Sequence, residues 1–195
     1  MERLAQQMAF VKELDRLKSV QRQTWLADAS RRENSAEHSW HIAVMALVLC
    51  EYAPRNDLDV GRVIQMLLVH DIVEIDAGDT FCYDREAVTR QAQREERAAE
   101  RLFGALPADI AVRLRDLWEE FEARRTPESL LANALDRLQP ILNNYASGGK
   151  SWRSNGITRE QVRRRNRIVA EGAPELWAYI EDLLQQAVRR GFLKE

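Results

Sequence analysis

Cysteine is scarce in this 195-residue chain, which has only Cys50 and Cys82. Two thiols are too few for a disulfide framework, so the fold must be stabilised by other means. Glycine and proline are also few, at eight and five residues, which favours a helical protein. No apolar run approaches the roughly 18 residues that span a bilayer, and the N-terminus lacks a signal-peptide pattern. These absences predict a cytoplasmic protein with no membrane partner.

A strong net charge is absent as well. The formal charge of -2 gives the chain no overall attraction to nucleic acid, so no nucleic-acid partner is expected. The hydrophobic share of 45% and the charged share of 31% are ordinary for a globular protein. This length suffices for one well-filled core and is short for two. We therefore expect a single domain over residues 1–195.

Apolar residues recur at helical spacing along most of the chain, whereas no alternating strand pattern of useful length occurs. Ser35 is a suitable N-cap for the second helix, and residues 75–83 and 147–150 are expected to be loops. The prediction is an all-α fold of seven or eight helices, with C-terminal helices over residues 158–191 packing on the rest. The expected helices cover residues 2–19, 35–52, about 59–74, 85–102, 107–122, 127–146, 158–172 and 174–191.

Four residues stand out in helices that otherwise present apolar faces. His70 and Asp71 end an apolar run, Asp136 interrupts a leucine-rich helix, and His38 lies near the start of another helix. Aspartate is almost never fully buried unpaired, and an imidazole buried beside carboxylates is costly without a compensating cation. Two histidines and two carboxylates suit one divalent transition metal, such as Co, Mn, Fe, Ni or Zn, whose identity the sequence leaves open.

The order of these residues resembles the HD-domain superfamily of metal-dependent phosphohydrolases. The likeness is greatest to the small HD proteins that resemble 5′-deoxynucleotidases, and it spans about residues 4–145. Four segments carry it: Leu17-Lys18-x-x-x-Arg22, Glu33-Asn34-x-x-Glu37-His38, His70-Asp71-x-x-Glu74-x-x-x-Gly78-Asp79 and Leu135-Asp136-Arg137-Leu138.

The resemblance implies one HD domain that hydrolyses 5′-(deoxy)nucleoside monophosphates with a metal-activated water. It further implies that Glu74 and Asp79 lie beside that water and the phosphate, where a carboxylate can transfer protons. Glu74 is our first choice for this role, while Asp79 has the alternative of capping the turn after Gly78. The implied ligands of the single metal are His38, His70, Asp71 and Asp136.

The small number of histidines bears on the number of metals. No histidine follows His70, and His41 matches no ligand position that we can assign. Dinuclear phosphodiesterases and di-iron oxygenases of the superfamily need additional histidines. A mononuclear site is therefore expected.

Basic residues near the first motif are candidates for substrate binding, because a phosphate monoester needs positive charge or oriented N–H groups. By the resemblance, Lys18, Arg22 and Arg32 lie where the family contacts substrate, and Arg22 is our first choice for the phosphate or sugar. Trp25 is a candidate stacking or wall residue, or else a core anchor. The run over residues 163–167 is interpreted as a solvated basic face, and Arg137 as a neutraliser of nearby acid.

Other conspicuous side chains are not expected to belong to the site. Cys82 is treated as incidental, because it has no histidine partner apart from the metal set. Trp118, Trp152 and Trp177 are interpreted as core or subunit contacts. A homodimer formed through the apolar faces of the last helices is expected from the resemblance alone.

Two alternatives to the nucleotidase hypothesis remain. An HD hydrolase of another phosphate ester, or of a guanosine alarmone pyrophosphate, would keep the fold. The alarmone enzymes place Glu and Asp side by side, which Glu74-Ile75-Asp76 does not. A metal-stabilised scaffold without catalysis is the other alternative, although the additional acids Glu74 and Asp79 would be unnecessary in a closed structural site.

Overall fold

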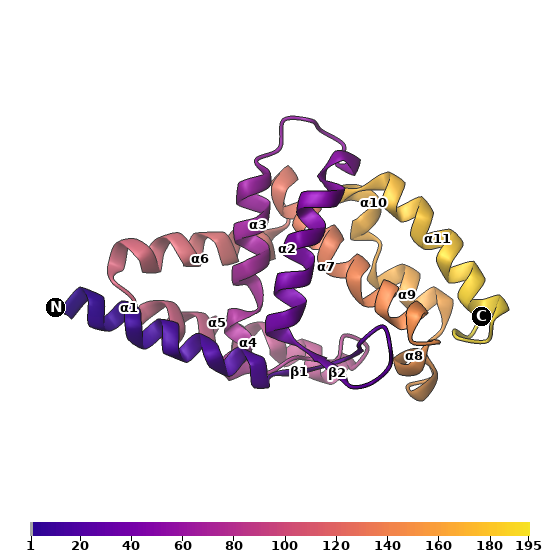
Figure 1. Ribbon diagram of the computed structural model, residues 1–195, viewed down its shortest axis with the longest axis horizontal. Coiled ribbons are helices and arrows are strands. Elements are labelled where there is room, and N and C mark those ends of the chain that lie inside the picture. Colours follow the sequence, from indigo (N-terminus) through magenta and orange to yellow (C-terminus); the bar gives the residue numbers. More distant parts are fainter. Residues whose placement is uncertain (1) are drawn as a thin grey trace.

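The computed structural model of the protein describes residues 2–195, apart from the side chain of Arg85. Helices dominate this part of the chain, which confirms the predicted all-α class (Figure 1). The first half contains α1 (Glu2–Glu13), η1 (Leu14–Ser19), β1 (Gln21–Trp25), β2 (Arg32–Asn34), α2 (Ser35–Leu49), η2 (Cys50–Tyr52), α3 (Val60–Val69), η3 (His70–Val73) and α4 (Glu74–Ala77). The second half contains α5 (Arg85–Gly104), α6 (Ala108–Ala123), α7 (Pro127–Ala146), α8 (Lys150–Ser154), α9 (Arg159–Arg165), α10 (Ile168–Gly172) and α11 (Pro174–Arg189).

Helix α7 runs through the centre of the molecule (Figure 1). Thr126 caps its N-terminus by accepting a hydrogen bond from the backbone N–H of Ser129, and Pro127 occupies the first turn. These are the start signals that the sequence predicts. Helices α2, α3, α6 and α10 all pack against α7, and its Leu131 and Leu135 have no exposed surface. The middle of α7 is thus buried on several sides, which brings any polar residue there into the core.

A short antiparallel hairpin occupies the polar segment in which no strand was expected. Strand β1 pairs with β2, with Gln21 opposite Asn34 and Trp25 opposite Arg32. The strands are only five and three residues long and mostly polar, so they lack the alternating pattern that identifies a strand in sequence. Their function in the fold is positional, because they bring Arg22 and Glu33 to the N-terminus of α2.

The expected helix over residues 59–74 is divided into three pieces. Asp59 caps α3, which passes at Val69 into the 3₁₀ helix η3, and α4 follows without a gap. The loop predicted from residue 75 begins only at Gly78, whose φ of 72° ends the helix in a conformation that suits glycine. Within η3, His70 lies with its Nε2 3.7 Å from Oδ1 of Asp136 on α7.

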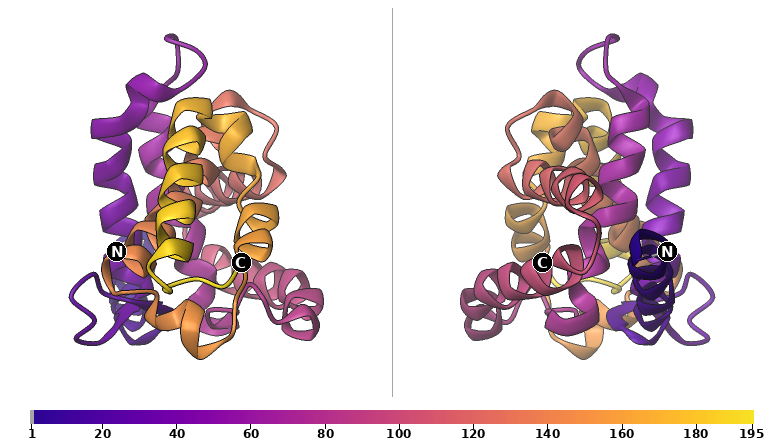
Figure 2. Two further views of the ribbon diagram at one scale, coloured as in Figure 1. Left: turned by 90° about the vertical axis from the view of Figure 1, so that its right-hand side faces the viewer. Right: turned by 90° about the vertical axis from the view of Figure 1, so that its left-hand side faces the viewer.

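The C-terminal segments pack on the core, as Figure 2 shows from the side of α11. The expected helix over residues 158–172 is interrupted near Asn166, giving α9 and α10. Helix α10 lies so close to α7 that a Cβ on Gly172 would be 2.3 Å from the carbonyl oxygen of Leu130. Such breaks explain why the described residues contain more helices than the seven or eight expected.

The apolar face of α11 is buried within the chain, where Ile180, Leu184 and Ala187 have no exposed surface. The expected dimer contact through the last helices is therefore not available on that face. No helix of the described residues has both the length and the apolar character needed to cross a membrane.

Candidate metal centre

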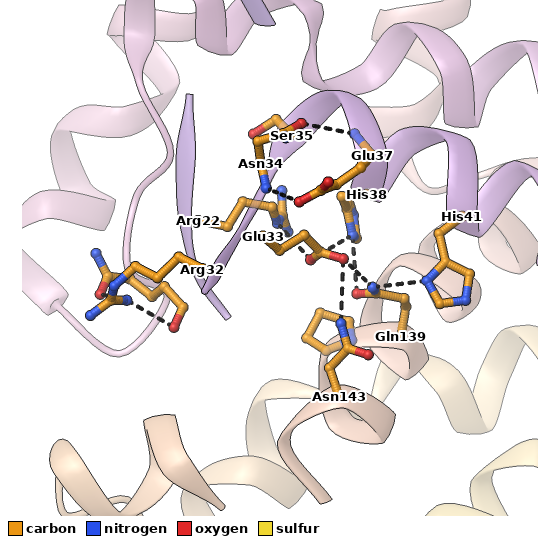
Figure 3. Close-up of polar contacts among 12 residues, drawn as sticks. Arg22, Arg32, Glu33, Asn34, Ser35, Glu37, His38, His41, Gln139 and Asn143 are labelled. Atoms are coloured by element: carbon orange, nitrogen blue, oxygen red, sulfur yellow. Dashed lines mark hydrogen bonds and ion pairs between the residues drawn. The ribbon is translucent and has the colours of Figure 1, made fainter. Parts of the chain in front are cut away.

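His38 is held in the first turn of α2 by a capping box. The Asn34 side chain accepts a hydrogen bond from the backbone N–H of Glu37 at 3.0 Å, and the Glu37 carboxylate accepts from the Asn34 N–H at 2.7 Å (Figure 3). The N-cap is thus Asn34 rather than the expected Ser35. This shift leaves the Ser35 hydroxyl free to donate to Glu74 Oε2 at 2.5 Å.

His70, Asp71 and Asp136 meet His38 in the core. Asp136 Oδ1 lies 3.0 Å from His38 Nε2 and 3.7 Å from His70 Nε2, while Asp71 Oδ1 lies 3.0 Å from the same His70 nitrogen. Ligand atoms of His38, His70 and Asp71 all lie within 4.8 Å of one another. The exposed fraction of these side chains is at most 10%. The structure therefore brings together the four residues that the sequence singled out.

Hydrogen bonds on the far side of each ring determine which nitrogen faces the centre. His70 Nδ1 lies 2.9 Å from the carbonyl oxygen of Leu67, which can only accept, so Nδ1 carries the hydrogen. The Gln139 amide nitrogen donates to Glu33, which leaves its Oε1 to accept from His38 Nδ1 at 3.1 Å (Figure 3). In the neutral form both rings therefore direct an Nε2 lone pair toward carboxylate oxygens.

Lone pairs and carboxylates that converge in a buried space repel each other unless a cation lies between them. His70 Nε2 is buried and has no hydrogen-bond partner among the described residues. Burial alone would lower the pKa of His70, but Asp71 and Asp136 raise it well above its ordinary value. The centre thus attracts positive charge, and its two nitrogens and two carboxylates fit a divalent first-row metal. The Gln139 and Leu67 contacts are the outer partners that orient metal-binding histidines in such sites.

Arg22 forms a buried counter-ion to the acidic side of the centre. Its Nη1 donates to Asp71 Oδ2 at 2.7 Å and lies 3.9 Å from Glu74 Oε2, while its Nε lies 3.7 Å from Glu33 Oε2. The side chain is 12% exposed and lines the cavity described below. Its Nε has no hydrogen-bond partner among the described residues, and the expected contact of Arg22 with phosphate or sugar stays a prediction.

Glu74 and Asp79 both face the same centre from the segment after Asp71. Burial raises the pKa of Glu74 well above its usual range, and the charge of Asp71 adds to this effect. Burial also raises the pKa of Asp79, which Arg22 partly opposes. Both carboxyl groups therefore hold a proton more readily than an exposed acid, and the Ser35 hydroxyl fixes the position of Glu74.

Lys18 and Trp25 are not brought to this place. The Lys18 ammonium group is exposed and pairs with Asp15. The Trp25 ring is covered by the Lys150 ammonium group at 3.3 Å from its centroid and by the Arg32 guanidinium at 5.4 Å. The described residues that line the cavity include neither side chain. The structure thus gives no contact between these two predicted substrate residues and the centre.

A cavity of about 300 Å³, a size within the range of small-molecule sites, is lined by three of the four candidate ligands, His70, Asp71 and Asp136. Glu74 and Asp79 line it on one side, and Trp152 and Arg165 line it from the C-terminal segments. Trp152 is buried, which confirms its expected place in the core, whereas Arg165 was not expected here because the 163–167 run was interpreted as a solvated face. A signal was present for Arg165, which falls on the helical stripe of Val162 and Val169, both fully buried.

Comparison with known proteins agrees with this geometry. Residues 14–177 match the family model of the HD domain. The chain belongs to the HD domain family. This HD domain is 51% identical to a protein from Magnetospirillum magnetotacticum MS-1 described as a predicted metal-dependent phosphohydrolase, with a TM-score of 0.93 over 100% of both chains. A conserved hypothetical protein from Pyrococcus furiosus shares the fold at a TM-score of 0.60 and 18% identity, over 93% of this chain and 99% of that one.

Curated relatives are similar over a shorter span. The 5′-deoxynucleotidase HDDC2 of Homo sapiens is 31% identical over 136 residues, which are 69% of this chain and 65% of that protein. The protein of the same name from Mus musculus is 32% identical over 137 residues, covering 69% and 66%. The chain thus spans slightly less than two thirds of the length of these relatives.

Proposed function

We propose that this HD domain is a metal-dependent phosphomonoesterase that hydrolyses 5′-(deoxy)nucleoside monophosphates to nucleoside and phosphate. The observation that carries the proposal is the convergence of two Nε2 lone pairs and two carboxylates beside a cavity that also contains Glu74 and Asp79. A purely structural site would have no need of those two additional acids. The names of the curated relatives support the substrate class.

The metal in this proposal is a single divalent transition ion bound by His38, His70, Asp71 and Asp136. When bound, such an ion lowers the pKa of water and offsets negative charge on the phosphoryl oxygens. The histidines supply neutral Nε2 donors because Leu67 and Gln139 hold the other hydrogens. Arg22 holds Asp71 in place and balances its charge.

Glu74 is the proposed proton-transfer group. Its raised pKa suits a carboxyl group that exchanges a proton either with the attacking water or with the leaving ester oxygen. The hydrogen bond from Ser35 keeps one carboxylate oxygen in a fixed place, and the other is free for this exchange. Asp79, on the loop after Gly78, is the second candidate for contact with the leaving group.

The experiment that tests the function is a measurement of phosphate release from a panel of ribo- and deoxyribonucleoside 5′-monophosphates. The protein is loaded in turn with Co²⁺, Mn²⁺, Fe²⁺, Ni²⁺ and Zn²⁺. We expect release from 5′-monophosphates in the presence of at least one metal and none after chelation. Absence of release from every monophosphate with every metal would favour the scaffold alternative and end the proposal.

Assembly and location are also proposals. A homodimer stays our expectation, and the exposed apolar row of Trp40, Val44, Leu47 and Val48 on α2 supports a contact surface there rather than on α11. Analytical ultracentrifugation distinguishes a dimer from a monomer directly. A cytoplasmic location likewise stays a prediction from the sequence.

A further inference from the structure

A phosphate dianion in the cavity requires positive charge that the protein has not already neutralised. The described cationic residues that line the cavity are Arg22, Arg124, Arg137 and Arg165. Arg22 is engaged by Asp71, Glu74 and Glu33. These carboxylates offset part of the Arg22 charge, so further arginines in the cavity would add to the positive charge that a phosphate needs.

Arg165 has few partners within the protein. It lies at the end of α9, is half-buried, and its Nε is buried without a hydrogen-bond partner among the described residues. No carboxylate in the part of the chain that the structure describes forms an ion pair with it. Its guanidinium interacts with the Cys82 thiol, which is a weak acceptor. A buried cationic donor without a partner is costly unless a ligand supplies the acceptor.

Arg137 provides a second guanidinium in the same cavity. It follows Asp136 on α7, its side chain is 17% exposed, and its Nε lies 3.7 Å from Asp136 Oδ2. Arg137 lines the cavity from α7 and Arg165 lines it from the end of α9, so both residues border the same space. Two like charges from separate helices are stabilised when an anion lies between them.

We propose that Arg165 and Arg137 form an anion subsite that binds the phosphate group of the substrate beside the candidate metal centre. The identity of that substrate rests on the proposed function, whereas the subsite itself requires only a phosphate. Guanidinium groups suit this role because their paired N–H donors match phosphate oxygens. Helix α9 thereby contributes a binding residue from outside the segment that contains the metal ligands.

Titration of inorganic phosphate into the Mn²⁺-loaded protein by isothermal calorimetry tests the subsite without relying on turnover. We expect Arg165→Gln to weaken phosphate binding about tenfold or more, since a charge-assisted hydrogen bond is lost. Arg164→Gln is the matched control, because Arg164 is the exposed neighbour on the same helix. This control should stay within twofold of wild type.

Two further variants keep the result clear if Arg165→Gln proves unstable. Arg165→Lys keeps the charge but loses the paired donors, and should weaken phosphate binding by an intermediate amount. Arg137→Gln should also weaken it. Wild-type affinity in Arg165→Gln or Arg165→Lys, or no phosphate binding by the wild-type protein at millimolar concentration, would overturn the subsite. If phosphate binding depends on Arg165 but no nucleoside monophosphate releases phosphate, the subsite is supported and only the proposed function is wrong.

Discussion

At the scale of single residues, the position of one hydrogen on each imidazole controls whether the candidate centre can bind a metal. Gln139 is oriented by its own donation to Glu33 and lies 3.2 Å from His41 Nδ1, so only its oxygen is available to His38. Gln139 follows Asp136 by one helical turn and is fully buried. It is therefore a positioning residue for His38, a role that its sequence position alone did not reveal.

We expect Gln139→Leu to weaken metal binding about 10- to 100-fold, because the outer partner of a ligating histidine is lost. Competition with a chromogenic chelator measures the affinity for Mn²⁺ or Co²⁺. Asn143→Leu is the control, since Asn143 donates to Glu33 at 3.3 Å without contacting His38. Equal affinities in the two variants would contradict this role of Gln139.

A second prediction is that loss of a metal ligand and loss of the proton-transfer group have different effects on metal content. Asp136→Ala should lose both metal and phosphate release, because Asp136 touches both histidines. Glu74→Ala should retain metal but lose turnover, since Glu74 bonds to Ser35 and faces the cavity. Metal content after desalting, measured together with phosphate release, distinguishes the two. Metal loss in Glu74→Ala would show that the assignment is wrong.

At the scale of elements, the close approach of α10 to α7 depends on Gly172. A Cβ at that position would lie 2.3 Å from the Leu130 carbonyl oxygen and 3.1 Å from Ala134 Cβ. We expect Gly172→Ala to lower the free energy of unfolding by about 1–3 kcal/mol, as overpacking does in a tight core. Urea denaturation measures this value.

Gly104→Ala is the matched control for that measurement. Gly104 also ends a helix, and a Cβ there would meet nothing within 4 Å. Alanine at such a site should be neutral or stabilise the protein by a few tenths of a kcal/mol. If both variants lower the free energy of unfolding by similar amounts, the effect at Gly172 does not come from the packing of α10 on α7.

Elements with strong local signals were the ones that the sequence predicted well. The Thr126-Pro127 start of α7 and the Thr158 cap of α9 are recognisable because a cap involves residues close in sequence. The β1–β2 hairpin and the break at Asn166 carry no such signal in the sequence. Asn166 is buried and donates to the Val162 carbonyl, a bond that no periodicity predicts.

In the candidate site, too, some residues have a clear signal in the sequence and others do not. His38, His70, Asp71 and Asp136 were found because polar residues in apolar helices are conspicuous in the sequence. Arg165 was assigned to a solvated face because the arginine run was interpreted as a whole, although Arg165 shares a helical stripe with the buried Val162 and Val169. Its place in the cavity depends on how the C-terminal segments pack against residues that are far away in the sequence.

At the scale of the whole molecule, the candidate ligands connect parts of the chain that are far apart in sequence. His38 belongs to α2, His70 and Asp71 to η3, and Asp136 to α7. A cation shared by these three elements links them at the centre of the fold, in addition to the apolar contacts between α2, α3 and α7. Without the cation, the buried carboxylates depend on Arg22 and on protons for charge balance.

Metal binding should therefore stabilise the entire fold. A ligand that binds only the native state at 100 times its dissociation constant adds about 2.7 kcal/mol to the free energy of unfolding. For a chain of this size we expect metal-loaded protein to melt roughly 5–10 °C above chelated protein. Differential scanning calorimetry of both forms measures the shift. The melting temperature of Asp136→Ala should change little when metal is added. If the melting temperature of the wild type changes with neither metal nor chelator, no cation links α2, η3 and α7.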